Sequence, residues 1–388
     1  MFLHSLSLTD FRNYAKKDFS FSEGLNLLVG SNASGKSNLL EAIYLLATGT
    51  SRRADLVDEM IRYDQELARI KGRIVQKTRN TRRVRESDNQ TIGQSDLSES
   101  SEFSELEILL TRGLLLGEKV AKKKFFLNGV AKRQFDFVGL LKAVSFGPED
   151  LGMITGGPSL RRDFLDLVLT QTNRDYGRAL LSYQKGLRQR NQVLEQIREQ
   201  NRSRTSLYFW DRLLIENSEL LTARRAAFLD FVNQNSSSLG NLSVTYQCNL
   251  ISPERLAKYL QAEIATGQTL IGSHRDDFEI AICNSPAGNA LRSNAGRQFV
   301  TRNLRLYGSR GEQRTAVFYL KLAELNFIQR QTGQTPVLLL DDIFSELDQS
   351  HRELILYSLP DLQVILTTTD LSLVEEKYRF KAKVISSE

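Results

Sequence analysis

The sequence GSNASGKS, from Gly30 to Ser37, constrains the fold of this chain more than any other feature. It follows a short apolar segment at 25–29 and precedes the apolar-periodic stretch NLLEAIYLLA. A strand, a glycine-rich loop and a helix in this order cradle the phosphates of a nucleoside triphosphate. The pattern therefore predicts a P-loop α/β core that binds ATP or GTP. The alternative is a glycine-rich turn that matches the motif by chance.

Each residue type in this loop suits phosphate binding. Gly30 and Gly35 let the backbone curl so that its N–H groups face phosphate oxygens. Lys36 supplies a positive charge for the β and γ phosphates, and Ser37 supplies a hydroxyl for Mg²⁺. We therefore expect nucleotide contacts from the whole loop, which comprises Gly30, Ser31, Asn32, Ala33, Ser34, Gly35, Lys36 and Ser37.

Composition sets broader limits. The 388 residues are 41% hydrophobic and 25% charged, which is typical of a globular chain of about two or three domains. Cys248 and Cys283 fit neither a disulfide framework nor a metal cluster, so we expect both to be buried. With no signal peptide and no apolar run long enough to cross a membrane, a cytoplasmic protein is expected. The net charge of +6 is compatible with a polyanionic partner.

Three β-like segments follow the P-loop helix, at 65–77, 104–113 and 118–133. The last contains Asn128-Gly129, a strong signal for a two-residue hairpin turn. These segments predict an antiparallel sheet beside the nucleotide-binding core. The stretch 86–104 is rich in serine and acidic residues and poor in large apolar residues, which predicts a disordered loop.

From about Ser159 the apolar residues follow a helical period. Leu180, Leu187 and Leu194 recur every seven residues, and a second helical stretch begins near Leu207. Two helices should pack as an antiparallel hairpin, and fewer than three heptads favour a short helical lobe over a long coiled coil. We therefore expect an N-terminal part of the head at 1–158, a helical lobe at 159–270 and a C-terminal part of the head at 271–388.

A second acidic motif complements the P-loop. Val337 begins an apolar run that ends in Asp341-Asp342. Such a run is typical of a parallel strand buried on both faces, and open α/β sheets bind ligands at the carboxyl ends of their strands. We expect Asp341 to organise Mg²⁺ and Asp342 to orient the attacking water. Together with Lys36, these are the predicted catalytic residues.

A third motif, YGSRGEQR, precedes the helical stretch TAVFYLKLAELNFI. Ser309 and Glu312 have the spacing of a capping box, which explains both residues without a ligand but leaves Gly311 and Gln313 unexplained. The order S-x-G-x-Q, then VLLLDD, then Ser345-Glu346-Leu347-Asp348 resembles the signature, Walker B and D-loop series of ABC-type ATPases.

The resemblance narrows to one family. The motifs LTDFRNY near the N-terminus, FGPEDLGMITGGPSLRRDFLD at 146–166, GSHRDD at 272–277 and LLLDDIFSELD near the C-terminus resemble the RecF family of bacterial recombination mediators. The resemblance implies an ABC-type ATPase head, with a mixed sheet and an antiparallel β subdomain, and a small helical lobe without a long coiled coil. It also implies a weak ATPase that binds DNA and dimerises on ATP. Such a protein would act at gapped DNA in repair, replication and the SOS response, with RecR and RecO as partners.

The ABC-type arrangement implies further nucleotide contacts. Ser309, Gly311 and Gln313 of one subunit would contact the ATP held by another. By the same resemblance, Arg12 and Glu149 are additional contacts, although each also suits a surface or capping charge. Transporters carry glutamate where this chain has Asp342 and commonly carry histidine at 367–369, where it has threonines, so we expect slow hydrolysis.

Basic residues offer several DNA-binding candidates, and no motif for reading bases is present, so we expect recognition of DNA structure. Three functional alternatives stay open: an ABC transporter ATP-binding subunit, a P-loop metabolic kinase, and a nucleotide sensor without turnover. The DNA-binding candidates are Arg79, Arg82, Arg83, Arg85, Lys122, Lys123, Lys124, Arg161, Arg162, Arg188, Arg190, Arg198, Arg202 and Arg204.

Overall fold

The computed structural model describes the chain except for residues 32–33, 79–99, 116, 237–240, 285–299, 346–348, 350–351, 354–361 and 387–388. The chain forms two compact units, one of residues 1–145 with 334–388 and one of residues 146–333. These limits differ from the expected domain boundaries because the helix after YGSRGEQR packs with the helices of the lobe.

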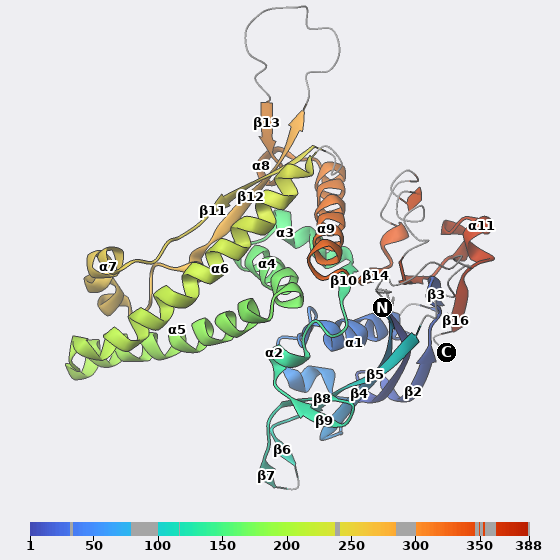
Figure 1. Ribbon diagram of the computed structural model, residues 1–388, viewed down its shortest axis with the longest axis horizontal. Helices are drawn as coiled ribbons and strands as arrows, with labels where there is room; N and C mark the ends of the chain where they lie inside the picture. Colours follow the sequence, from blue (N-terminus) through green and yellow to red (C-terminus); the bar gives the residue numbers. More distant parts are fainter. Residues whose placement is uncertain are drawn as a thin grey trace, which may run out of the picture. The chain divides into compact units, whose positions relative to one another are not determined.

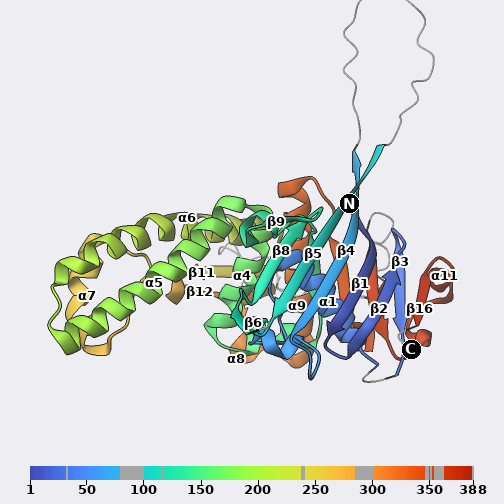
Figure 2. The ribbon, with the colours of Figure 1, turned by 90° about the horizontal axis from the view of Figure 1, so that it is seen from below.

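The first unit contains a six-stranded antiparallel sheet in the order β2-β1-β4-β5-β8-β9 (Figure 2). Asn128 and Gly129 have φ of +50° and +76° in the turn between β8 and β9, as the hairpin signal predicts. Residues 100–104, expected in a loop, instead extend the ladder between β4 and β5, while 86–99 lie outside the described residues. The strands are β1 (Phe2–Phe11), β2 (Tyr14–Ser20), β4 (Leu67–Thr78), β5 (Ser100–Thr111), β8 (Lys123–Leu127) and β9 (Val130–Lys132).

A second sheet has the order β10-β14-β15-β3-β16. Strand β15 pairs in parallel with β14 and with β3, and β3 pairs in parallel with β16. The apolar runs of β3, β14 and β15 are buried, as expected for strands covered on both faces. Helix α1 (Lys36–Thr48) contacts strands of both sheets. The strands are β3 (Leu25–Val29), β10 (Ala143–Phe146), β14 (Val337–Asp341), β15 (Val364–Thr368) and β16 (Lys383–Ser386).

Short elements complete the first unit. They are η1 (Val57–Met60), β6 (Leu114–Leu115), β7 (Glu118–Lys119), α2 (Gln134–Phe137), η6 (Ile343–Ser345), η8 (Leu371–Leu373) and α11 (Glu376–Arg379).

The second unit is mainly helical (Figure 1). Helices α5 and α6 pack against each other as the predicted hairpin, and Leu194 and Ile197 lie in its buried core. Among the described residues these are the longest helices, at 27 residues each, so the prediction of a helical lobe without a long coiled coil is confirmed. The main elements are α4 (Pro158–Thr172), α5 (Arg174–Gln200), α6 (Tyr208–Gln234), β11 (Leu242–Gln247), α7 (Pro253–Thr266), β12 (Asp277–Asn284), β13 (Val300–Asn303) and α9 (Arg310–Thr332).

Short helical turns connect these elements. They are η2 (Pro148–Leu151), α3 (Gly152–Thr155), η3 (Arg204–Leu207), η5 (Ser273–Arg275) and α8 (Leu304–Tyr307).

Two composition-based expectations have different outcomes. Cys248 is exposed, so the expectation that it is buried was wrong, and the side chain of Cys283 lies outside the described residues. In the described part of the chain, no helix combines the length and the apolarity needed to cross a membrane.

Candidate nucleotide site

The predicted strand, loop and helix occur in the predicted order, with β3 ending at Val29 and α1 beginning at Lys36. Gly35 precedes the helix with φ of +97°, in the left-handed region. A Cβ at this position would lie 2.6 Å from the Asn13 Nδ2 atom and 2.8 Å from the Tyr14 hydroxyl oxygen. Both the backbone angle and the lack of space therefore require glycine.

The ammonium group of Lys36 folds over this loop. Its Nζ atom donates to the backbone carbonyls of Gly30 and Ser31, at 2.7 Å each. The side chain is buried, and no carboxylate in the described part of the chain forms an ion pair with it. A buried charge that only carbonyls accept is suited to an anionic ligand. The triphosphate of ATP supplies such a group, so the loop fits the predicted nucleotide.

Asp341 and Ser37 lie 304 residues apart in the sequence but are hydrogen-bonded, with 2.9 Å between the Ser37 Oγ and Asp341 Oδ1 atoms. The sheet order explains this, because β15 lies between β3 and β14 and brings the carboxyl ends of all three strands to one edge. Thr367 on β15 donates to the same Asp341 oxygen at 2.9 Å. Both predicted Mg²⁺ ligands are thus together.

This donor set fits Mg²⁺, which prefers hard oxygen ligands and keeps several waters or phosphate oxygens in its shell. No lysine or arginine in the described part of the chain forms an ion pair with Asp341, whose partners are two neutral hydroxyls. The same residues contain no group of three or more His, Cys, Asp or Glu side chains that could hold a metal. Waters and phosphate oxygens would therefore complete the coordination of an ion at Ser37 and Asp341.

Asp342 lies beside this pair in an unusual backbone conformation. Its φ is +50°, and its N–H donates to the Thr367 hydroxyl oxygen at 2.9 Å. Aspartate tolerates the left-handed region better than most side chains do, so this residue type suits the backbone conformation at position 342. Burial raises the pKa of Asp342 and the neighbouring Asp341 raises it further, while Lys36 lowers it.

Arg12 is held by its own chain. Its Nε and Nη2 atoms donate to the Glu41 carboxylate at 2.9 and 2.7 Å, and its Nη1 atom donates to the Glu59 carbonyl at 2.8 Å. Glu41 is on α1, directly after the P-loop, so this ion pair fixes the first helix to the turn between β1 and β2. The contacts give Arg12 a supporting role, and direct contact with nucleotide stays a prediction.

Sequence reasoning missed three residues that shape this site: Asn13, Tyr14 and Thr367. The Tyr14 hydroxyl donates to the Gly35 carbonyl at 3.1 Å, and burial raises the pKa of Tyr14 to about 12, so the hydroxyl stays protonated. Asn13 and Tyr14 belong to the LTDFRNY motif, so the signal was present but only its arginine was selected. Thr367 was noted only as a residue in place of a histidine.

The signature segment belongs to the second unit. Ser309 caps α9 and forms the predicted capping box with Glu312. Gly311 is exposed, and a Cβ there would meet no atom within 4 Å, so the fold of the protomer does not require glycine at this position. The Gln313 amide is buried and donates to the Leu304 carbonyl at 2.9 Å, which gives it a structural role. Glu149 is exposed on η2, in this same unit.

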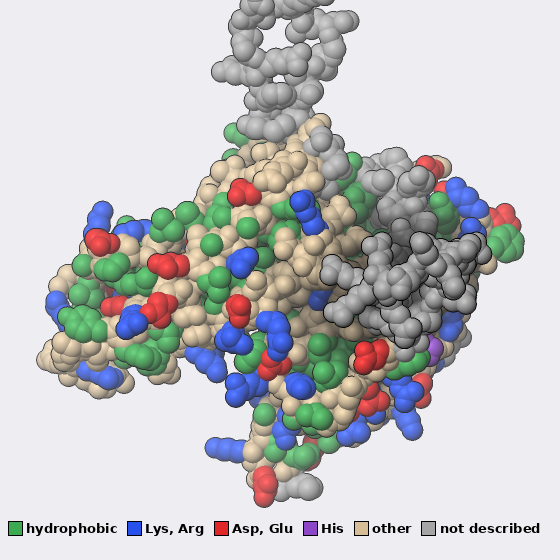
Figure 3. Space-filling model, in the orientation of Figure 1, with side chains coloured by type: hydrophobic (Ala, Val, Ile, Leu, Met, Phe, Trp, Pro, Cys, Tyr) green, Lys and Arg blue, Asp and Glu red, His purple; other side chains and the backbone are tan. Residues whose placement is uncertain are grey.

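Two of the DNA-binding candidates are buried. Arg161 is 3% exposed and forms two hydrogen bonds with Asp277, at 2.6 and 3.0 Å. Arg190 is fully buried between Asp211 and Glu263. Both arginines form buried ion pairs within the fold, so the structure does not support these two candidates. On the face seen in Figure 3, basic and acidic side chains are interspersed over the region of α5, α6 and α7.

The other candidates divide into three groups. Arg162 donates to the Asp276 carbonyl, while Lys122 and Lys123 bind Asp58 and the Gly49 carbonyl. Lys124, Arg188, Arg198, Arg202 and Arg204 are exposed. Arg79, Arg82, Arg83 and Arg85 lie outside the described residues, as do Asn32, Ala33 and the D-loop residues Glu346, Leu347 and Asp348.

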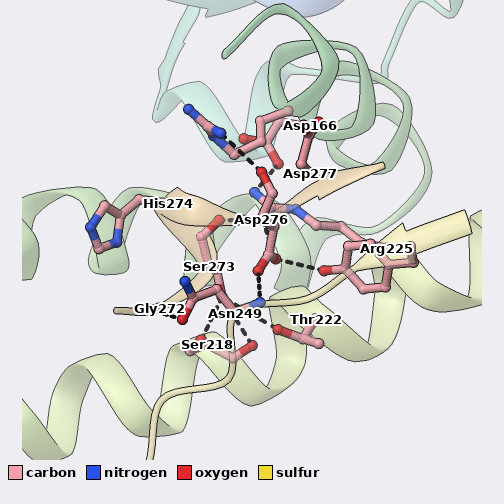
Figure 4. A network of polar contacts seen from close by, with 12 residues as sticks. Asp166, Ser218, Thr222, Arg225, Asn249, Gly272, Ser273, His274, Asp276 and Asp277 are labelled. Atoms are coloured by element: carbon pink, nitrogen blue, oxygen red, sulfur yellow. Dashed lines mark hydrogen bonds and ion pairs between the residues drawn. The ribbon is translucent and has the colours of Figure 1, made fainter. Parts of the chain in front are cut away.

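The GSHRDD segment is the centre of a buried polar network (Figure 4). Asp276 accepts hydrogen bonds from the Arg225 guanidinium at 2.8 Å, the Tyr246 hydroxyl at 2.6 Å and the Asn249 N–H at 2.7 Å. Arg225 also donates to Asp166 at 2.8 Å. The network links α4, α6 and β11 to the turn before β12 within the second unit, so this motif stabilises the lobe.

Comparison with known proteins gives the family. The family described as "RecF/RecN/SMC N terminal domain" matches residues 2–385. Relatives named "DNA replication and repair protein RecF", from Synechocystis and from Lachnoclostridium phytofermentans, are each 33% identical. The alignments cover 99% and 96% of this chain, and 96% and 93% of the relatives. This chain belongs to the RecF family.

A solved RecF structure agrees with this assignment. The structure described as the recombination mediator protein RecF-ATP in the RecFOR pathway has a TM-score of 0.77 and 30% identity. The alignment covers 96% of this chain and 93% of that chain. The predicted fold class, a RecF-type ATPase head with a helical lobe, is therefore confirmed. RecF membership also favours the repair interpretation over a transporter subunit or a metabolic kinase.

Proposed function

We propose that this chain is an ATP-dependent DNA-binding protein of recombinational repair and replication, which dimerises on ATP and hydrolyses it slowly. The observation that carries the proposal is the Ser37–Asp341 contact of 2.9 Å beside the buried Lys36 ammonium. The names of the relatives, which refer to DNA replication and repair, support the DNA substrate. The similar structure is described as part of the RecFOR pathway, which supports RecR and RecO as partners.

Within the proposed site, each group has one task. Lys36 neutralises the β and γ phosphates, and Ser37 and Asp341 hold Mg²⁺, which when bound would neutralise further charge on the phosphate oxygens. Asp342 orients the attacking water. Ser309 and Gly311 of a second copy contact the γ phosphate, so ATP joins two protomers. Gapped DNA, the SOS response and a cytoplasmic location belong to the same proposal.

Light scattering tests the ATP-dependent dimer. We expect the mass of a monomer without nucleotide and of a dimer with ATP and Mg²⁺, reinforced by a gapped DNA duplex. A Gly311→Leu variant should bind ATP but stay monomeric, because a side chain there fits the free protomer and blocks a close neighbour. Helix α9 of this variant should be at least as stable as in the parent chain, because the helix propensity of leucine exceeds that of glycine by about 0.5–1 kcal/mol. An ATP-dependent dimer of Gly311→Leu would refute the signature-mediated contact.

Turnover separates the slow ATPase from a nucleotide sensor. Release of phosphate that depends on Mg²⁺ and falls in an Asp342→Asn variant would support hydrolysis. Equal background release from both proteins, with ATP still bound, would instead identify a sensor.

A further inference from the structure

A groove of about 230 Å³ lies in the second unit, between the C-terminal parts of α4, α6 and α9. Its size is below the roughly 300–1,000 Å³ of small-molecule pockets, so it suits one or two side chains of a partner. Its floor is apolar and includes Leu169, Phe231 and Phe327. Its rim carries Arg224, Arg330 and uncharged polar side chains, and no aspartate or glutamate among the described residues lines it.

The two rim arginines differ from most arginines of this unit. Arg224 and Arg330 are exposed, and neither forms a hydrogen bond or ion pair with another described residue. By contrast, Arg225, the next residue along α6, is buried and bonded to Asp166 and Asp276. The Arg330 guanidinium lies 5.8 Å from the centre of the Phe231 ring. A guanidinium over an aromatic ring keeps its N–H edges free for a carboxylate.

The floor is preformed. Leu169 is 2% exposed and Phe327 is 5% exposed, so both are fixed by the core beneath the groove. The Phe231 ring packs against Phe327 with 5.3 Å between ring centres. An apolar side chain in the groove would therefore contact rings that are already ordered, and little ordering cost would offset its burial.

We propose that this groove binds an acidic peptide segment of a partner protein, with one apolar residue on the floor and flanking carboxylates on Arg224 and Arg330. We choose an acidic partner because of charge complementarity: Arg224 and Arg330, on two different helices, line the groove without an ion pair to any described residue, and no described carboxylate lines it. The apolar floor distinguishes a peptide from a nucleic acid backbone, whose phosphates gain nothing from phenylalanine and leucine. The groove lies apart in the sequence from the signature segment and makes no use of ATP.

Fluorescence anisotropy with a labelled peptide tests the proposal on the full-length chain. The probe is a twelve-residue peptide with one phenylalanine between runs of aspartate. Binding should be saturable and should weaken as salt rises. Reversing both charges, in Arg224→Glu with Arg330→Glu, should weaken it about tenfold, as expected for two exposed ion pairs replaced by repulsion. A peptide with serine in place of phenylalanine should also bind about tenfold more weakly.

Arg212→Glu is the matched control. Arg212 is on α6 like Arg224, and its side chain is 83% exposed, but it pairs with Glu216 and does not line the groove. This variant should bind the probe like the parent chain. The proposal would be overturned if Arg212→Glu weakened peptide binding as much as the double variant does, or if the double variant bound the peptide as tightly as the parent chain. Absence of saturable peptide binding would also overturn it. So would binding of an oligothymidine that is weaker in the double variant and that the peptide does not displace.

Discussion

Asp341 in the first unit and Asp276 in the second are held in opposite ways. Asp276 is fully buried, and a guanidinium, a phenol and a backbone N–H donate to it. Asp341 has only two neutral hydroxyl partners in the described part of the chain. A carboxylate whose charge is neutralised within the fold stabilises that fold. A carboxylate with only neutral donors keeps a net negative charge that can bind a cation. The partners of an aspartate therefore distinguish a structural centre from a binding site.

Removal of Arg225 should have the largest effect. Arg225→Met leaves Asp166 and Asp276 without their shared cation, which should cost about 3–5 kcal/mol of unfolding free energy. Urea unfolding followed by circular dichroism measures this loss. Arg224→Met changes the exposed neighbour and should stay within about 0.5 kcal/mol of the parent chain. Similar stabilities for the two variants would contradict the structural role of the network.

Asp341→Asn should give the reverse result, with little loss of stability and a large loss of function. Asparagine keeps an oxygen for the Ser37 and Thr367 hydroxyls, so we expect a change of less than about 1 kcal/mol in unfolding free energy. Mg²⁺-dependent ATP binding should weaken by about 100-fold, because the charged metal ligand is lost. Calorimetric titration with ATP, with and without Mg²⁺, measures this. Undiminished Mg²⁺ dependence would place the metal elsewhere.

Thr367→Val should have an intermediate effect. Valine has nearly the same shape, but the variant loses the hydroxyl that donates to Asp341 and accepts from the Asp342 N–H. We expect about tenfold weaker Mg²⁺-dependent ATP binding, as for other residues that orient metal ligands. Thr367→Ser retains the hydroxyl and should restore most of the affinity. If serine were as weak as valine, packing rather than hydrogen bonding would explain the loss.

A pH effect of the second unit should be the smallest. The His274 Nε2–H donates to the Thr269 carbonyl, and in the neutral ring the Nδ1 atom accepts from the Tyr183 hydroxyl. Burial lowers the pKa of His274 to about 4. In the unfolded chain, His274 takes up a proton near pH 6.5, whereas in the folded chain it stays neutral down to about pH 4. The stability that this difference contributes is therefore complete above pH 6.5 and is lost as the pH falls towards 4.

Urea midpoints at pH 7 and pH 5 measure this dependence. A His274→Gln variant should be less stable at pH 7 but should show a smaller difference between the two pH values. An unchanged difference would assign the dependence to other groups.

The sequence predicted features that depend on local pattern. The P-loop, the Asn128-Gly129 turn and the capping box at Ser309 each lie within a few consecutive residues, so their residue types nearly determine their geometry. The apolar run before Asp341 predicted a buried strand for the same reason.

Features that depend on distant partners were not predictable in this way. Arg161 resembles any helical surface arginine in sequence, and its burial follows from Asp277, 116 residues later. Thr367 gains its role only because β15 lies between β3 and β14. The orientation of Gln313 depends on the preceding turn, because the Leu304 carbonyl in that turn accepts a hydrogen bond from the Gln313 amide.

The order of the parallel sheet has a consequence for synthesis of the protein. Strand β3, which leads into the P-loop, is paired on one side with β15 and on the other with β16. Residues 25–29 therefore lack both neighbours until 364–386 have left the ribosome. At about 5–20 residues per second, they wait on the order of tens of seconds. During this time the exposed apolar strand is a natural target for chaperones, and nascent chains should be unable to retain ATP.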